Sequence, residues 1–437
     1  MSVSVALGTG RSDEPVRVVR GDWWSVGIGL LLVLAVASAY GLGIPLDVFQ
    51  TSVPKPWPKT PLGLQIAHHW AAYVATWLVL LLLTVLPAVR SGVSLGQYAL
   101  GFTVLFAAAW GVLILGSQQI LKQDGLEYPF WALILGVVAG NLLRIPSSIE
   151  SATAQSELFI KISIVLLGAN LPFSIVAKSG PRAFVEAAII VAVGFAVSQV
   201  LGRWLKLDDR YLAVLGAGAS VCGVSAAIAV GNTVRAKPRQ IGYVVSLVVV
   251  YGLILIFVLP ALVHGFHLSA LKAGAWIGGS ELADASGAAA AQMVGDAAVK
   301  AFSLVKLSRD VLISLVCLIF AVIATAVWDR KAGAGDANHP SLGALVWDRF
   351  PKFVIAFIVA SILSTWWQSA YGKAFATDFT NNLNALRTWL FTLTFLSIGL
   401  NTRFRDLRDV SGKAIAVFTV TVLVNVVVGG LLAAALF

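Results

Sequence analysis

A glycine- and serine-rich stretch at 216–225 interrupts an apolar segment and could bind an anion. Each glycine lowers helix propensity by about 1 kcal/mol relative to alanine, so we expect the helix to break here. A break frees backbone N–H groups at the positive N-terminus of the second half-helix, which favours anions. The alternative is a face of small residues for close helix packing. The candidate anion-binding residues are Gly218, Ser220, Cys222, Gly223 and Ser225.

A second broken stretch, at 276–287, places two acidic residues in an apolar segment. Glu281 and Asp284 are three residues apart and would share a helix face. Because carboxylates are costly inside a membrane, we expect this pair to bind the coupling ion. They could instead cap a half-helix, or belong to an interfacial turn. Gly279 and Ser280 are the candidate substrate-binding residues beside them.

Two single cations could offset the charge of a bound anion. Lys161 lies in the short apolar run 157–171, where pairing with Glu157 at the i, i+4 spacing is the alternative. Arg309, with Lys306 on the same face, is expected to open the helix at 307–327. Its fork of donors suits an oxyanion, and anchoring at the membrane surface is the alternative.

The composition is that of an integral membrane protein. The 437 residues are 58% hydrophobic and only 12% charged, whereas about 25% charged residues is usual in soluble domains. The net charge of +10 fits headgroup contacts rather than nucleic-acid binding, because no basic and aromatic patch is present. Two cysteines exclude a disulfide framework, and the absence of a P-loop and of a nucleophile–base pair argues against an ATPase or another enzyme.

We predict an all-α polytopic protein with about thirteen membrane helices, each of about 20 apolar residues. A polar tail (1–22) precedes N-terminal transmembrane helices (23–121) and a transporter core (125–437). The expected segments are 23–42, 66–89, 97–121, 126–142, 157–171, 183–204, 211–231, 241–263, 274–300, 307–327, 350–371, 386–401 and 413–437.

Two short motifs suggest an internal repeat. The segment 167–173 (LGANLPF) is similar to 398–404 (IGLNTRF), and each is followed by a basic linker with Ser-Gly and a long apolar segment. Seven expected spans separate the copies, and an odd number implies opposite orientations. This is the pattern of inverted-repeat transporters. Chance similarity between Gly- and Leu-rich helices is the alternative.

These segments together resemble the YeiH family of proposed sulfate exporters. The matching stretches are 125–128 (GLEY) through Asn141, 162–173, 215–223 (LGAGASVCG), 276–278 (WIG), 305–309 (VKLSR) and 396–400 (LSIGL). The resemblance implies two structural repeats with crossing broken helices and an anionic sulfur compound as substrate. It also implies a His-Glu pair and a following Gln in the second broken helix. In this chain the aligned residues are Leu282, Ala283 and Ser286, and the acidic residues Glu281 and Asp284 are displaced by one position.

We therefore expect a secondary transporter of a small anion in the bacterial inner membrane, coupled to H⁺ or Na⁺ and needing no other cofactor. The expected partners are the substrate and membrane lipids, not nucleic acid, and a homodimer is left open. A cation/proton antiporter is the first alternative, and an anion channel is the second.

Overall fold

The chain folds entirely into helices where the structure describes it. The computed structural model describes residues 22–42, 47–57, 61–123, 127–329, 347, 350–402 and 410–437. Within these ranges it contains seventeen α-helices and one π-helical turn. The described ranges contain nine helical segments that are long and apolar enough to cross a membrane. The predicted all-α polytopic membrane fold is confirmed. Of the predicted polar tail 1–22, residues 1–21 lie outside the described residues and Asp22 begins the first helix.

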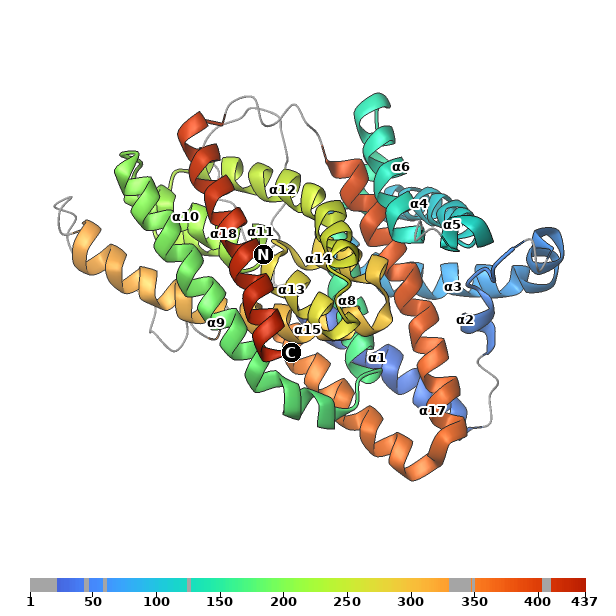
Figure 1. Cartoon of the computed structure of the whole chain (residues 1–437). Coiled ribbons are helices and arrows are strands. Elements are labelled where there is room, and N and C mark those ends of the chain that lie inside the picture. Colours follow the sequence, from blue (N-terminus) through green and yellow to red (C-terminus); the bar gives the residue numbers. More distant parts are fainter. Residues whose placement is uncertain are drawn as a thin grey trace. The chain divides into compact units, whose positions relative to one another are not determined.

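The helices form two compact units. Figure 1 shows the helices, coloured along the sequence. The first contains the described parts of 19–177 and 352–403. In this unit the long α17 packs against α8, α6 and α1. Its helices are α1 (Asp22–Gly41), α2 (Asp47–Thr51), α3 (Leu62–Arg90), α4 (Leu95–Gly116), α5 (Gln119–Gln123), α6 (Tyr128–Leu142), α7 (Ser147–Thr153), α8 (Ser156–Ala169) and α17 (Lys352–Asn401).

The second unit contains the described parts of 178–351 and 404–437. Most of α9 (Phe173–Trp204) belongs to it, and α13 packs between α15 and α18. Its other helices are α10 (Asp209–Ser220), α11 (Val224–Thr233), α12 (Pro238–Gly265), α13 (Ala270–Ser280), α14 (Asp284–Val294), α15 (Asp296–Ile323), the π-helical turn η1 (Ala324–Asp329) and α18 (Gly412–Leu436).

Several predicted boundaries were wrong. The expected segment 274–300 includes the start of α15, because Gly295 adopts φ +132° and ends α14. Arg309 therefore lies inside α15, not at a helix start near 307. The predicted start at 183 is also wrong, since α9 begins at Phe173 and continues through Pro181. The segments 350–371 and 386–401 join in α17, which is kinked at Gly372 (φ +81°).

The predicted repeat remains a prediction. The first motif, 167–173, spans the end of α8 at Ala169, and the second, 398–404, spans the end of α17 at Asn401. Residues 403 and 404 of the second motif lie outside the described residues. Both motifs thus coincide with helix ends in the first unit, but these ends alone do not establish an inverted repeat.

Glycines set the distance between α6 and α17 in the first unit. A Cβ atom built on Gly399 would lie 2.7 Å from the carbonyl oxygen of Leu133 and 2.8 Å from the Cα atom of Gly136. The two backbones are therefore in direct contact at this crossing. Small residues permit such close approach between membrane helices, where dispersion contacts and weak hydrogen bonds drive association.

We predict that Gly399→Leu destabilises the first unit, while Gly111→Leu in α4 does not. Both substitutions raise helix propensity equally, but only Gly399 is packed on backbone, whereas a Cβ on Gly111 would meet nothing within 4 Å. Overpacking costs about 1–3 kcal/mol. Thermal unfolding in detergent should show a lower Tm for Gly399→Leu alone. An equal Tm for the two variants would contradict the close crossing.

Candidate functional site

The predicted breaks at 216–225 and 276–287 are both present, and they lie side by side in the second unit. The first separates α10 from α11 between Ser220 and Val224, and the second separates α13 from α14 between Ser280 and Asp284. Gly223 adopts φ +68°, and a Cβ atom on it would lie 3.0 Å from the carbonyl oxygen of Leu282. Only glycine suits this backbone conformation and this approach.

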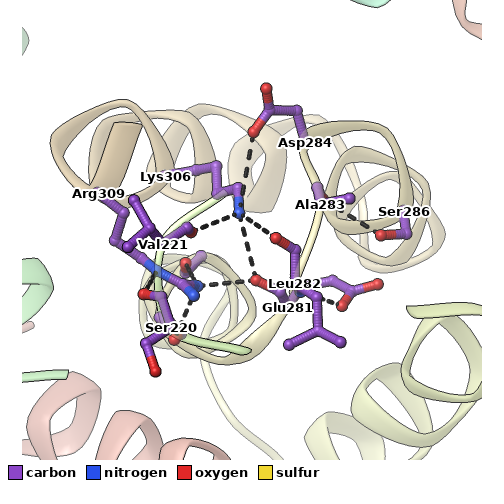
Figure 2. Close-up of polar contacts among 11 residues, drawn as sticks. Ser220, Val221, Glu281, Leu282, Ala283, Asp284, Ser286, Lys306 and Arg309 are labelled. Carbon is purple, nitrogen blue, oxygen red and sulfur yellow. Dashed lines mark hydrogen bonds and ion pairs between the residues drawn. The ribbon is translucent and has the colours of Figure 1, made fainter. Parts of the chain in front are cut away.

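Arg309, on α15, binds the ends of both half-helices (Figure 2). Its Nε donates to the carbonyl oxygen of Ser220 at the end of α10 (3.1 Å). Its Nη1 donates to three carbonyl oxygens at the end of α13: Gly278 and Gly279 at 2.9 Å each, and Glu281 at 2.7 Å. The guanidinium is fully buried, so a single side chain satisfies carbonyls from two broken helices.

Lys306 lies one turn earlier on the same face of α15 and binds the same two breaks. Its Nζ donates to the carbonyl oxygens of Leu282 (2.8 Å), Val221 (3.2 Å) and Glu281 (3.4 Å). The carboxylate of Asp284 lies 3.8 Å from the same Nζ. Figure 2 shows these contacts converging on the Lys306 ammonium between the two breaks.

These two cations neutralise the negative ends of α10 and α13. The last carbonyls of a helix have no partner within it and carry partial negative charge. Without water they need other donors, since an unsatisfied backbone group in a membrane interior costs several kcal/mol. Arg309 and Lys306 supply those donors, and we call them, with the two breaks, the crossing site.

Carboxyl groups outnumber the cations among the described residues around the crossing site. Glu281 is fully buried, and its Oε2 accepts a hydrogen bond from the Leu282 N–H, while its Oε1 has no hydrogen-bond partner in the described part of the chain. Asp284, Asp310 and Glu186 also interact electrostatically with the cations. If all were ionised, four negative charges would face two positive ones. Protons or another cation can balance this excess.

The other predicted residues on the first broken helix have different surroundings. Gly218 packs against α12, because a Cβ there would lie 2.5 Å from Val244 Cγ1. Ser220 is buried, and its Oγ accepts a hydrogen bond from Asn425 Nδ2 (3.2 Å). The Cys222 thiol is buried, whereas the side chain of Ser225 is exposed. The alternative interpretation of this stretch, a face of small residues for close helix packing, therefore applies to Gly218.

On the second broken helix, Gly279 and Ser280 form the end of α13. The carbonyl of Gly279 binds Arg309. Ser280 is fully buried, and its hydroxyl has no hydrogen-bond partner among the described residues. Among those residues, no group of three or more His, Cys, Asp or Glu side chains could hold a metal ion.

Lys161 has two acidic partners within the first unit. It belongs to α8 in the first unit, where its Nζ pairs with Asp22 (2.8 Å) and Glu157 (3.4 Å). The i, i+4 pairing considered as the alternative is therefore present, together with a pairing to α1 that local spacing could not reveal.

Glu186 and Asn425 were not among the predicted site residues, although the structure places them at the breaks. Glu186 is the single acidic residue in the apolar segment 183–204, and Asn425 is the single amide side chain in 413–437. That is a recognised sign of function in membrane helices. A search for isolated acidic and amide side chains within the predicted segments 183–204 and 413–437 would have found both residues.

Comparison with known proteins identifies the family. The family described as Conserved hypothetical protein 698 matches residues 100–418. The chain belongs to this family. A relative, the UPF0324 membrane protein RB9488 of Rhodopirellula baltica, is 30% identical over 385 residues, covering 86% of this chain and 68% of its own.

Other UPF0324 membrane proteins are also similar to this chain. One of Nitratidesulfovibrio vulgaris is 31% identical over 71% of this chain, which spans 54% of that relative's length. NE0724 of Nitrosomonas europaea is 26% identical over 90% of this chain and 91% of its own. No solved structure matches the chain. The protein is thus a multi-pass member of the UPF0324 membrane protein family, and its homologues are bacterial.

We predict that Arg309→Lys destabilises the protein. An ammonium cannot reproduce the fork that binds carbonyls of both α10 and α13, and each buried carbonyl left without a donor costs about 1–3 kcal/mol. The matched control is Arg203→Lys, at an exposed pair with Asp209 (2.9 Å), where such pairs contribute about 0–1 kcal/mol. Thermal unfolding should show a clear loss of Tm for Arg309→Lys only. Equal Tm values would mean that Arg309 does not hold the breaks together.

Proposed function

We propose that this UPF0324 protein is a secondary active transporter of a small anion across the bacterial inner membrane, working by alternating access and coupled to H⁺ or Na⁺. The observation that carries the proposal is the meeting of two broken helices at the buried cations Lys306 and Arg309. Broken helices that meet in this way form substrate and ion sites in several transporter folds. YeiH-type proposed sulfate exporters are members of the family, so sulfate is one candidate substrate.

The anion would bind at the start of α11. The first N–H groups of a helix point outward and carry partial positive charge, and the cap residue Gly223 supplies no side-chain acceptor for them. Ser220 and Ser225 lie on either side of this cap. The start of α14 is less suitable, because its first residue, Asp284, already places a negative charge there.

The coupling ion would bind among the carboxyl groups. Glu281 has one oxygen without a hydrogen-bond partner among the described residues, and Asp284 lies 3.8 Å from Lys306. A proton or Na⁺ bound here would reduce the excess of negative charge and make anion binding nearby more favourable. That reciprocity is thermodynamic coupling between two sites. Alternating access also needs two bodies that move, and the two compact units are the candidates.

A cation/proton antiporter is the second candidate, and the charge count over the described residues favours it. Two basic groups against four acidic groups leave the fully ionised crossing site negative, which attracts cations and repels anions. In that case Glu281 and Asp284 would bind the transported ions. An anion channel would differ from both in showing conductance without exchange.

We predict gradient-dependent, saturable anion uptake in proteoliposomes. Sulfate, sulfite, thiosulfate, taurine and small carboxylates would each be offered with and without a pH or Na⁺ gradient. Uptake of one anion, weakened by the Ser220→Ala, Ser225→Ala double variant, is the expected result. Cation-driven proton flux with no anion uptake would replace the anion carrier by the antiporter. Large currents in planar bilayers without exchange would indicate a channel.

We further predict that Glu281→Gln removes coupling. The amide has the shape of the acid but cannot carry a proton or attract Na⁺, so stimulation by the gradient should fall roughly tenfold or more, a coupling loss of about 1.4 kcal/mol. Glu157→Gln, at an exposed carboxylate of α8, is the control and should keep full stimulation. Unchanged stimulation in Glu281→Gln would place the coupling ion elsewhere.

A further inference from the structure

Glu186 is a buried carboxyl group in α9. Its side chain is 0% exposed, and neither carboxyl oxygen has a hydrogen-bond partner among the described residues. Oε1 lies 2.8 Å from the position that a Cβ atom on Gly279 would occupy. The carboxyl group therefore packs directly on the backbone at the end of α13, where only a glycine leaves space for it.

A charged group from α15 acts on Glu186. The guanidinium of Arg309 interacts electrostatically with the carboxyl group. A Cβ atom on Gly279 would also meet two uncharged groups, Ile190 Cδ1 of α9 (2.6 Å) and the Cα atom of Gly429 in α18 (3.6 Å). Arg309 is in turn under the influence of Asp310, Glu281 and Asp284.

Arg309 also has an unused donor. Its Nε and Nη1 bind carbonyl oxygens, but its Nη2 is buried without a hydrogen-bond partner in the described part of the chain. Each N–H group at Nη2 could donate to a carboxylate. Within these described ranges, the second unit thus contains a buried acid with no donor and, within electrostatic reach, a buried donor with no acceptor.

An unpaired buried carboxylate costs far more free energy than the neutral acid. The arrangement around Glu186 therefore suits the protonated form. If the proton leaves, the carboxylate needs a donor, and Arg309 Nη2 can supply one. A new ion pair there would compete with the bonds that hold the Gly278 and Gly279 carbonyls.

We propose that Glu186 binds a coupling proton in addition to the ion bound at Glu281 and Asp284, and that the loss of the proton from Glu186 creates an ion pair with Arg309. The O–H bond of the carboxyl group breaks, the proton passes to water, and the carboxylate accepts hydrogen bonds from Nη2. The hydrogen bonds from Arg309 of α15 to the carbonyl oxygens of Gly278 and Gly279 at the end of α13 are then weakened. This inference rests on the proposed function and adds a second site, specific for H⁺, at a residue outside both broken helices.

Infrared difference spectroscopy tests the proposal without requiring transport. Purified full-length protein would be titrated from pH ~5 to ~9, a range that includes the titration of buried carboxyl groups. The wild type should show the loss of a protonated-carboxyl band with rising pH. Glu186→Gln should lack this band, and Glu150→Gln, at an exposed position of α7, should retain it. A band that persists in Glu186→Gln, or is missing from the wild type, overturns the proposal.

Two further measurements cover a variant that fails to fold. Labelling all glutamate carboxyl groups with ¹³C should move the band, whereas labelling aspartate should not. The same shift in Glu281→Gln would separate Glu186 from the other fully buried glutamate of this unit, and a band that moves only with aspartate label excludes Glu186. Glu186→Asp should regain a titrating band if it folds, and failure to do so counts against an acid at this site. A band assigned to Glu186 in a protein that transports nothing would refute the proposed function but not the proton site.

Discussion

The crossing site depends on hydrogen bonds from two cationic side chains to backbone carbonyls. A helix interrupted inside a membrane leaves carbonyl groups that water cannot reach, and such groups must be satisfied by protein. Arg309 and Lys306 satisfy five of these acceptors, contributed by Ser220, Val221, Gly278, Gly279 and Leu282, and both also bind the carbonyl of Glu281. Once the breaks are present, this requirement explains why α15 places Arg309 and Lys306 against them.

Because two cations are buried at the crossing site, acidic side chains are also needed near them. A buried charge is tolerated only when it is paired or hydrogen-bonded, and carbonyl dipoles alone bring no full negative charge. Asp284, Asp310, Glu281 and Glu186 act electrostatically on the cations and exceed them in number among the described residues. The same groups that make the breaks tolerable therefore leave a site whose net charge depends on bound protons or cations. Structure and coupling would share one set of residues.

The two breaks could be predicted from the sequence because several glycines and serines within one apolar stretch disfavour a continuous helix. Glu281 and Asp284 could be singled out because carboxylates are rare in such stretches. The role of Arg309 could not be predicted, because its partners are backbone carbonyls, which any residue supplies, and because Gly295 was not recognised as a helix end. The contact of Glu186 with Gly279 joins residues 93 positions apart, and no local pattern reveals it. Lys161 shows the opposite case, since the spacing to Glu157 did indicate its partner.

The departure from the resemblance at 282–286 can now be interpreted physically. A His-Glu pair is implied where this chain has Leu282 and Ala283. Here Leu282 contributes its backbone: its carbonyl binds Lys306, and its N–H binds Glu281. The backbone contacts that hold the break therefore do not depend on the side chain at 282, so this side chain can change while the break persists. The acid one residue earlier, Glu281, contacts the same lysine through its own carbonyl. If the backbone contacts stay fixed while the titratable side chains occupy different sequence positions, members of one family could keep the fold and differ in substrate and coupling ion.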